Sequence, residues 1–236
     1  MDHSSPRSSS DPAARAGKRL LDDETRFFKT LLESPRLTGA VAPSGRYLAR
    51  AMARAVDPNR DGLVVELGPG TGPVTRALIE RGVKRERLVL VEYDSGFCRL
   101  LAQRFAPIRV VQGDAYNLPL TLAELAGQPV AAVVSSLPLL NQPPDQRTKL
   151  IDDAFALMGE DGVLVQFTYG LLSPIPREAC AKRYSAHRSA PIWRNLPPAR
   201  VWTYRADANA SADEPLIAQV RRRAERLMRG KRRCGQ

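Results

Sequence analysis

The stretch Val64-Val65-Glu66-Leu67-Gly68-Pro69-Gly70-Thr71-Gly72 decides how the rest of this chain is interpreted. A short β-branched run ends in an acid, three glycines follow at alternate positions, and Pro73 then opens a helical pattern. Glycines permit positive φ angles and let the backbone approach a ligand closely. The first turn of a helix offers unpaired N–H groups. The stretch therefore predicts a strand, a tight turn and a helix start, as a nucleotide-binding glycine loop requires.

A second acidic residue, Glu92, ends the next apolar run, residues 88–91. A carboxylate at this place can bind the two hydroxyls of a ribose, as the acid of dinucleotide-binding folds does. A P-loop is excluded, because no Gly-Lys-Ser/Thr follows the glycines. The two acids and the turn between them predict a nucleoside ligand. The alternative is a plain glycine-rich turn in another kind of α/β protein.

Strands and helices alternate through the middle of the chain, which favours a mainly parallel, doubly wound sheet with helices on both faces. We expect a disordered tail at 1–17, N-terminal helices at 18–60, a core at 61–205 with a basic insertion at 170–198, and a linker with a basic amphipathic helix at 206–236. Ser44 is expected to cap a helix at 45–56. The expected strands are 62–67, 87–92, 108–112, 130–135, 162–169 and 200–204, and the expected core helices are 73–81, 95–105 and 145–158.

The order Glu-x-Gly-x-Gly-x-Gly resembles the S-adenosylmethionine loop of class I methyltransferases. The resemblance implies a Rossmann-like fold with S-adenosylmethionine as cofactor. It further implies that the loop surrounds the methionine moiety, that Glu92 binds the ribose, and that Asp114, after the third strand, faces the adenine. The full set of expected cofactor residues is Ser44, Glu66, Gly68, Pro69, Gly70, Thr71, Gly72, Glu92, Tyr93, Asp114, Ala115, Ser135 and Leu137.

The composition is that of a globular protein with an unusual charge. The chain has 236 residues, a net charge of +11 and a pI of about 10.1. This excess implies an anionic partner, either nucleic acid or an anionic membrane surface. A zinc site and a disulfide framework are not expected, because the three cysteines and two histidines lack the necessary spacing. With no apolar leader and no run long enough to span a bilayer, we expect a cytoplasmic protein.

Two amphipathic segments flank the core. Residues 18–33 place leucines and phenylalanines on one arc, and residues 215–233 surround an apolar arc with arginines. Such helices suit a membrane surface, although the first would equally suit packing onto the core. The residues expected to touch the membrane are Lys18, Arg19, Phe27, Phe28, Leu31, Arg221, Arg222 and Arg226.

Four further segments carry a more specific resemblance. These are Thr38-Gly39-Ala40-Val41-x-Pro43-Ser44, Ser136-Leu-Pro-Leu-Leu140, Gln166-Phe-Thr-Tyr-Gly170 and Trp193-Arg-Asn-Leu-Pro-Pro198. Together with the glycine loop they resemble the bacterial phospholipid N-methyltransferases of the Rhizobium/Agrobacterium type. The resemblance implies successive methylation of phosphatidylethanolamine to phosphatidylcholine, by a protein peripheral to the inner face of the cytoplasmic membrane. We expect a monomer with no metal.

The acceptor amine must be neutral and must point its lone pair at the methyl group. Tyr47, Ser136 and Tyr169 are the expected orienting residues, and tyrosine rings also attract the quaternary cation that methylation produces. The lipid phosphate needs a cation, for which Arg177, Lys182, Arg183 and Arg194 are the candidates.

Two other functions compete with this hypothesis. The rRNA adenine-N6 dimethyltransferases resemble this chain in the glycine loop, but their Asn/Asp-Leu-Pro-Tyr/Phe motif holds the target base. Ser136 and Leu139 stand at its first and last positions here, which disfavours a nucleic-acid substrate. A binding protein that keeps the fold without turnover is disfavoured by the intact glycine loop with Glu66 and Glu92.

Overall fold

The computed structural model describes residues 43–180, 183–195 and 197–207. The tail, the helix expected at 18–33 and the helix expected at 215–233 lie outside this part of the chain. So do all eight expected membrane residues (Lys18, Arg19, Phe27, Phe28, Leu31, Arg221, Arg222 and Arg226) and Lys182. Within the described residues, no helix combines the length and the apolarity that crossing a bilayer requires.

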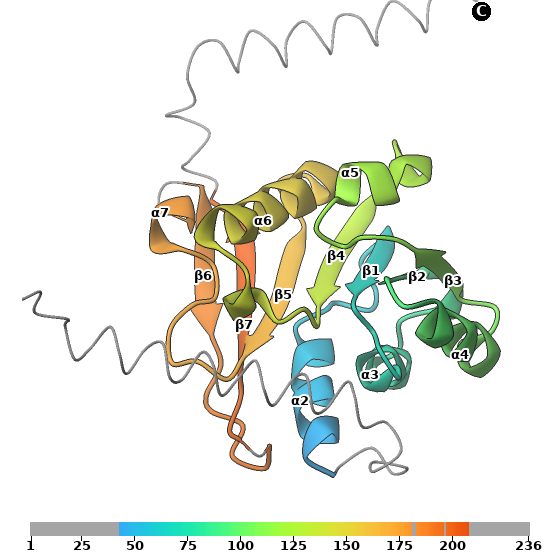
Figure 1. Cartoon of the computed structure of the whole chain (residues 1–236), viewed down its shortest axis with the longest axis horizontal. Helices are drawn as coiled ribbons and strands as arrows, with labels where there is room; N and C mark the ends of the chain where they lie inside the picture. The colour runs from blue at the N-terminus through green and yellow to red at the C-terminus, as the bar shows by residue number, and fades with distance from the viewer. Residues whose placement is uncertain (1–42, 181–182, 196, 208–236) are drawn as a thin grey trace, which may run out of the picture.

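A single seven-stranded sheet organises the described chain, in the order β3-β2-β1-β4-β5-β7-β6 (Figure 1). The strands β3, β2, β1, β4 and β5 are parallel to one another, whereas β7 runs antiparallel to both β5 and β6. This confirms the mainly parallel, doubly wound sheet. The strands are β1 (Leu63–Leu67), β2 (Leu88–Glu92), β3 (Arg109–Gln112), β4 (Val130–Ser135), β5 (Val163–Thr168), β6 (Tyr184–Arg188) and β7 (Arg200–Ala206).

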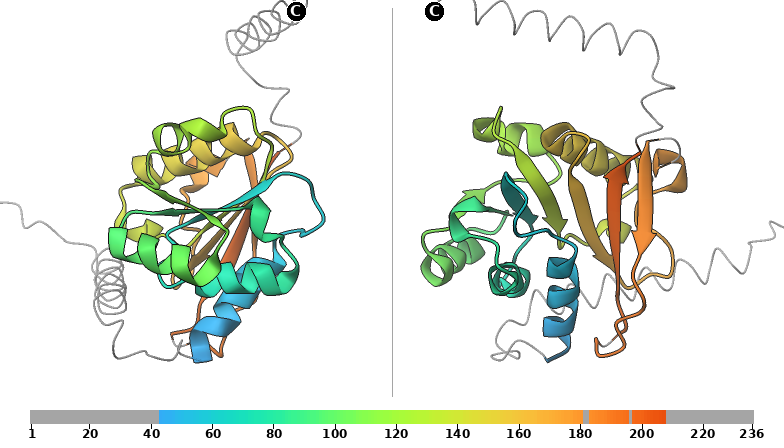
Figure 2. Two further views of the ribbon diagram at one scale, coloured as in Figure 1. Left: turned by 90° about the vertical axis from the view of Figure 1, so that its right-hand side faces the viewer. Right: turned by 180° about the vertical axis from the view of Figure 1, so that it is seen from behind.

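Helices cover both faces of the sheet (Figure 2). Val64 packs with α2, α3 and α4 on one face, and its neighbour Val65 packs with α5 and α6 on the other. Parallel strands are apolar on both faces because each face is covered in this way. The helices are α2 (Pro43–Arg54), α3 (Pro73–Arg81), α4 (Ser95–Phe105), α5 (Leu118–Thr121), α6 (Pro144–Met158) and α7 (Arg177–Cys180), with short 3-10 turns η1 (Arg85–Arg87), η2 (Ala123–Leu125) and η3 (Leu139–Asn141).

The expected bounds of α3, α4 and β4 are confirmed. Two expectations were wrong. The helix expected at 45–56 begins at Pro43, so Ser44 lies inside α2 and does not precede it as a cap. The segment at 170–198 is not wholly an insertion, because residues 184–188 form β6, which extends the sheet beyond β7.

The sheet has a carboxyl end, at which β1 to β5 finish, and an opposite amino end. Thr168, the last residue of β5, is paired with Arg200, and Arg188, the last residue of β6, is paired with Trp202. The connection from β6 to β7 (residues 189–199) therefore lies at the carboxyl end, where Figure 1 shows it beside α2. The start of β6, and α7 before it, lie at the amino end. In sheets of this type ligands bind at the carboxyl end.

Candidate functional site

The three glycines between β1 and α3 all have positive φ, of 66° for Gly68, 55° for Gly70 and 82° for Gly72, but their surroundings differ. A Cβ added at Gly72 would lie 2.3 Å from the ring of Phe105, and one at Gly68 would lie 2.9 Å from Leu137. A Cβ at Gly70 would meet no atom of the described residues within 4 Å. Gly68 and Gly72 are thus needed for packing, while Gly70 leaves space in which a ligand can approach the backbone.

Glu66, on β1, is fully buried below this loop. Thr75 of α3 donates a hydrogen bond from its hydroxyl to Glu66 Oε2 at 2.7 Å. Burial raises the pKa of Glu66 to about 8, and this effect outweighs the Thr75 hydrogen bond, which lowers the pKa. The other oxygen, Oε1, is buried and has no hydrogen-bond partner among the described residues. A buried acceptor left unpaired is costly, so this atom fits a ligand that donates to it, such as the ammonium group of a methionine moiety.

Glu92, at the end of β2, accepts hydrogen bonds from three backbone N–H groups. Its Oε2 accepts from Gly70 at 3.0 Å, and its Oε1 accepts from Tyr93 at 2.9 Å and from Asp94 at 3.0 Å. The carboxylate therefore ties the glycine loop to the turn that follows β2. A carboxylate offers about four acceptor positions, so roughly one remains for a ribose hydroxyl. Tyr93 itself is exposed.

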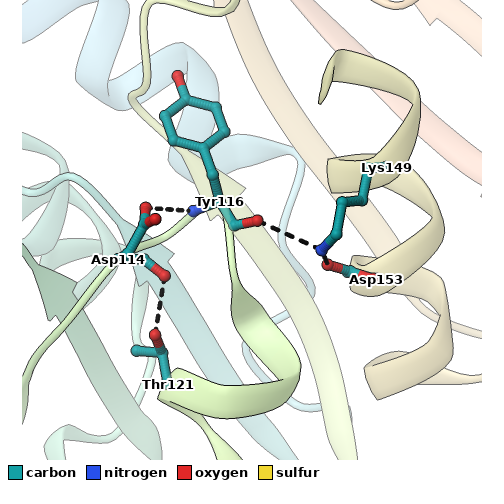
Figure 3. Close-up of polar contacts among 5 residues, drawn as sticks. All are labelled: Asp114, Tyr116, Thr121, Lys149 and Asp153. Atoms are coloured by element: carbon teal, nitrogen blue, oxygen red, sulfur yellow. Dashed lines mark hydrogen bonds and ion pairs between the residues drawn. The ribbon is translucent and has the colours of Figure 1, made fainter. Parts of the chain in front are cut away.

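Asp114 lies in a turn after β3 that is held from two sides (Figure 3). Its side chain accepts from the Tyr116 N–H at 2.8 Å, and its carbonyl accepts from the Thr121 hydroxyl at 2.8 Å. Lys149 of α6 donates to the Tyr116 carbonyl at 3.4 Å and is paired with Asp153. Asp114 is exposed and the adjacent Ala115 is buried. A fixed turn with an accessible acid fits the place expected for the adenine.

The turn after β4 holds the expected acceptor residues. The Ser136 N–H donates to the Leu67 carbonyl at 2.9 Å, and the buried Ser135 hydroxyl accepts weakly from the Leu137 N–H at 3.4 Å. Gln166 of β5 donates from Nε2 to the carbonyls of Leu137, at 2.9 Å, and Phe167, at 2.8 Å. The structure thus gives Gln166 a role in holding this turn. The signal in the sequence was a polar amide inside an apolar strand.

A narrow pocket opens where β4 and β5 end. Tyr169 stands at this pocket, with its ring edge-on to Phe167 at a centroid distance of 5.6 Å. Leu139 is almost fully buried in the cluster that packs against α6. The pocket can therefore admit an apolar or cationic group more readily than an anion. Its lining residues are Leu137, Pro138, Leu139, Leu140, Asn141, Phe167, Thr168, Tyr169 and Pro174.

Tyr47 of α2 contacts Arg194 of the β6–β7 connection. The guanidinium donates to the Tyr47 hydroxyl at 3.1 Å and lies 5.1 Å from the centroid of its ring. Tyr47 is 39% exposed. The contact brings an aromatic ring and a cation together at the carboxyl end of the sheet.

The structure does not bring the proposed phosphate-binding cations together. Arg183 lies at the amino end, where it is paired with Asp152 at 2.9 Å and packs over the Tyr184 ring. Arg177 is on α7, which ends next to Arg183. Of the three candidates that the structure describes, Arg194 alone lies at the carboxyl end. We expected the cations that follow β5 to lie together at the carboxyl end of the sheet. This expectation was wrong for Arg177 and Arg183. In the described ranges, no three His, Cys, Asp or Glu side chains gather as a metal site would require.

Comparison with known proteins also indicates a methyltransferase. Residues 64–162 match the family model described as a methyltransferase domain. The chain is 33% identical over 132 residues to the ornithine lipid N-methyltransferase of Singulisphaera acidiphila, a match that covers 55% of this chain and 69% of that protein. It is 38% identical over 98 residues to the ribosomal RNA small subunit methyltransferase A of Synechococcus sp. (strain JA-2-3B'a(2-13)), covering 40% of this chain and 32% of that protein.

Other proteins named ribosomal RNA small subunit methyltransferase A match at 30–44% identity, over 27–72% of this chain. The chain spans about a third of the length of several of them, and 63% of the one from Myxococcus xanthus. Among solved structures, the 1,6-didemethyltoxoflavin-N1-methyltransferase of Burkholderia thailandensis, with bound S-adenosylhomocysteine, has a TM-score of 0.56 at 18% identity. That match covers 86% of this chain and 93% of that chain. At this identity the likeness concerns the fold.

Proposed function

Because this chain belongs to the class I S-adenosylmethionine-dependent methyltransferases, we propose that it methylates the amine of a membrane lipid. The lipid is phosphatidylethanolamine, and successive transfers give its mono- and dimethyl forms and then phosphatidylcholine. One observation carries this proposal: the chain is 33% identical to a protein named ornithine lipid N-methyltransferase, in a match that covers 69% of that protein.

S-adenosylmethionine, when bound, supplies a methyl group that is already activated by its sulfonium. The chain's own residues bind the cofactor and orient the acceptor amine. Gly70 leaves the backbone accessible, the unpaired Oε1 of Glu66 suits an ammonium group, and Glu92 suits ribose hydroxyls. Thr75 and the backbone hold these two acids in fixed positions before any ligand arrives, which lowers the cost of binding.

The acceptor side positions an amine. Tyr169 lines the pocket, Ser136 directly precedes the lining residue Leu137, and the two residues orient the amine toward the methyl group. The amine must be neutral to react, and its proton leaves to water or to a neighbouring hydroxyl. The apolar lining (Leu137, Leu140, Phe167) supports an acceptor with an apolar body, because burying such surface is favourable. The tyrosine ring retains its attraction for the product after every N–H has been replaced.

The phosphodiester of the lipid is held by Arg194. A guanidinium binds phosphate oxygens through two parallel hydrogen bonds. Arg194 is the one described candidate at the same end of the sheet as the pocket, and Tyr47 holds it there. Arg177 and Arg183, at the other end, have no part in headgroup binding.

The partner surface is an anionic bilayer, and the protein acts on the inner face of the cytoplasmic membrane as a peripheral monomer. The net charge of +11 supports this part of the proposal. Each Lys or Arg near an anionic surface contributes about 1 kcal/mol of attraction, which salt weakens.

The similarity to rRNA methyltransferases supports a second candidate, adenine-N6 methylation of RNA. Those enzymes need an acceptor and an aromatic platform for a flipped base. Here Leu139 stands at the position of the platform and is 2% exposed, so it cannot offer a face to a base. Ser136 replaces the acid or amide. These two residues favour the lipid.

Purified protein with radiolabelled S-adenosylmethionine decides between the candidates. It would be incubated with vesicles of phosphatidylethanolamine and phosphatidylglycerol, with vesicles that contain ornithine lipid, and with unmethylated small-subunit rRNA. Label in mono-, di- and trimethylated phosphatidylethanolamine is the expected result. Label in ornithine lipid alone would show that ornithine lipid is the acceptor in place of phosphatidylethanolamine. Label in RNA alone would establish the second candidate. Calorimetric titration with S-adenosylhomocysteine checks that the protein used is competent to bind cofactor.

A further inference from the structure

Large apolar side chains are exposed next to the acceptor pocket. Leu171 and Leu172 are each 72% exposed in the loop after β5, and Trp193 is 75% exposed in the β6–β7 connection. A single exposed leucine on a soluble protein is ordinary. Three such residues lie at the same end of one sheet, in two loops, and exposed apolar side chains that gather on one side of a protein mark an interaction surface.

The two loops are held to each other and to α2. Arg188, at the end of β6, donates to the Leu171 carbonyl at 3.4 Å. In the other loop, Ile192 and Ala199 form a β-bridge beyond the ends of β6 and β7, so Trp193 lies at the tip of an extended hairpin. Figures 1 and 2 show this connection projecting beyond the sheet beside α2. Arg194 ties the tip to Tyr47. The exposed side chains are therefore presented by a braced structure.

The charge around these two loops is of one sign. Residues 43–48, 169–176 and 188–200 contain no Asp or Glu, but they contain Arg46, Arg188, Arg194 and Arg200. Acids of the carboxyl end lie elsewhere, since Asp94 and Asp114 follow β2 and β3. An anionic surface is thus attracted to the side of the carboxyl end formed by the start of α2 and the β6–β7 connection.

We propose that Leu171, Leu172, Arg188, Trp193 and Arg194 form a membrane-contact rim, which seats the mouth of the acceptor pocket on an anionic bilayer. The inference rests on the lipid acceptor proposed above and names the surface that meets the lipid. Leucines enter the acyl region, tryptophan prefers the headgroup boundary, and arginines pair with lipid phosphates. RNA fits the same rim less well, because single-stranded RNA is held by stacked aromatic and guanidinium groups and gains little from aliphatic side chains. The rim adjoins Tyr169 and Pro174 of the pocket in the chain, so a lipid can enter the pocket from the bilayer without crossing water.

Tryptophan fluorescence tests the rim directly, because the chain has only two tryptophans, Trp193 and Trp202. Trp202 lies on β7 with its ring N–H buried. The full-length chain would be mixed with phosphatidylethanolamine–phosphatidylglycerol vesicles that carry bromine on the acyl chains near the headgroup, and binding would be measured by flotation. We expect quenching of at least twofold in the wild type and almost none in Trp193→Phe. Unquenched Trp193 in protein that floats with the vesicles would overturn the proposal, as would a Trp193 response to small-subunit rRNA but not to vesicles.

A kinetic experiment separates failure of the rim from failure of the proposed function. In the double variant Leu171→Ser/Leu172→Ser, methylation of phosphatidylethanolamine in vesicles should fall at least fivefold, while methylation of a short-chain analogue dispersed in detergent should stay within twofold of the wild type. Leu120→Ser is the matched control, because Leu120 is 74% exposed on α5, away from the β6–β7 hairpin. Wild-type rates on vesicles in the double variant would refute the rim and leave the lipid acceptor intact. No methylation of either lipid by the wild type would refute the proposed function itself.

Discussion

Around the ends of β1 and β2 the decisive acids are buried and bonded to residues at most 22 positions away in the chain, whereas around β5, β6 and β7 the decisive polar contacts join residues 29 to 147 positions apart. Thr75 and Glu66 are nine residues apart, and Gly70 and Glu92 are 22 apart. In the acceptor half, Gln166 holds a turn 29 residues away, and Arg194 contacts Tyr47 across 147 residues. The cofactor half is thus built from local sequence, and the acceptor half from the way in which the sheet is completed.

This difference fits the two ligands that the halves bind, the cofactor in one and the acceptor in the other. A rigid, desolvated cofactor half suits a ligand that does not change from one methylation to the next. An exposed acceptor half suits a substrate that arrives from outside the protein and changes its charge distribution with each transfer. Substitutions should therefore affect cofactor binding in one half and acceptor kinetics in the other.

The largest effects are expected in the glycine loop, where two substitutions of the same kind should behave differently. Gly72→Ala places a Cβ 2.3 Å from Phe105 at a φ of 82°, and should destabilise the fold by about 3 kcal/mol. In Gly70→Ala the new Cβ meets no atom in the part of the chain that the structure describes, and the substitution should cost only about 1 kcal/mol for its positive φ. It should nevertheless weaken S-adenosylmethionine binding at least tenfold, because the new methyl group occupies ligand space. Urea unfolding and calorimetry measure the two effects. Equal stability losses in the two variants would contradict this assignment.

Glu66→Gln should change the pH dependence of stability. The pKa of Glu66 is about 8 in the folded protein and about 4.5 in the unfolded chain. The folded state therefore holds the proton more tightly, and the ligand-free wild type should lose stability as pH rises from about 4.5 to about 8. The glutamine variant should lack this loss, which thermal unfolding across that pH range would reveal. Parallel curves for the two proteins would show that the carboxyl is already ionised.

The same carboxyl should couple cofactor binding to proton release. An ammonium group beside Glu66 favours the ionised carboxylate, so binding at pH 7 should release a proton from the wild type and none from Glu66→Gln. Calorimetry in buffers of different ionisation enthalpy measures the number of protons. Asp114→Asn is a useful control, because that carboxyl is exposed and the Glu66 carboxyl is buried.

Gln166→Leu should impair the acceptor half alone. The Leu137 carbonyl loses its hydrogen bond, at a cost of about 1–3 kcal/mol, and the Ser136–Leu137 turn shifts. We expect kcat to fall about tenfold, since a misplacement of about 1 Å has effects of this order or larger. The Kd for S-adenosylhomocysteine should stay within twofold. A comparable loss of cofactor affinity would show that the two halves are not independent.

The smallest effect is expected for the headgroup cation. Arg194→Ala should raise KM for phosphatidylethanolamine several-fold with little change in kcat, because a rim arginine contributes roughly 1 kcal/mol. Arg183→Ala removes an equal charge at the amino end, where it is paired with Asp152, and should leave KM unchanged. Equal effects of the two substitutions would mean that the arginines act only through net charge.

The sequence could be used to place the cofactor half almost completely. The acid-ended strands, the glycine turn and the α3 and α4 bounds each follow from short patterns, and the structure has them where these patterns predict. β6 could not be predicted, because it is an outer strand whose residues are mostly exposed and which ends in His187 and Arg188. Charged side chains on an outer strand protect the sheet against pairing with other molecules. The same side chains interrupt the alternation of apolar and polar residues from which a strand is predicted.

The cations after β5 were misjudged for a related reason. Arg177 and Arg194 are close in the sequence, but the chain returns to the amino end before β6 begins. Only the antiparallel pairing of β6 and β7 decides which cation lies at the carboxyl end. Gln166 was overlooked because a strand residue gives no indication in the sequence of what its side chain holds. These features depend on tertiary structure, which local patterns do not encode.

The unpaired Oε1 of Glu66 also bears on how long the protein survives in a cell. A buried polar atom with no partner among the described residues keeps the ligand-free protein less stable than its packing would allow. Any ligand that binds only the folded state adds RT ln(1 + [L]/Kd) to its stability. The abundance of the protein should therefore follow the supply of S-adenosylmethionine. When the methyl donor is scarce, a larger share of the chain unfolds and is degraded, so methylation capacity declines together with the metabolite it consumes.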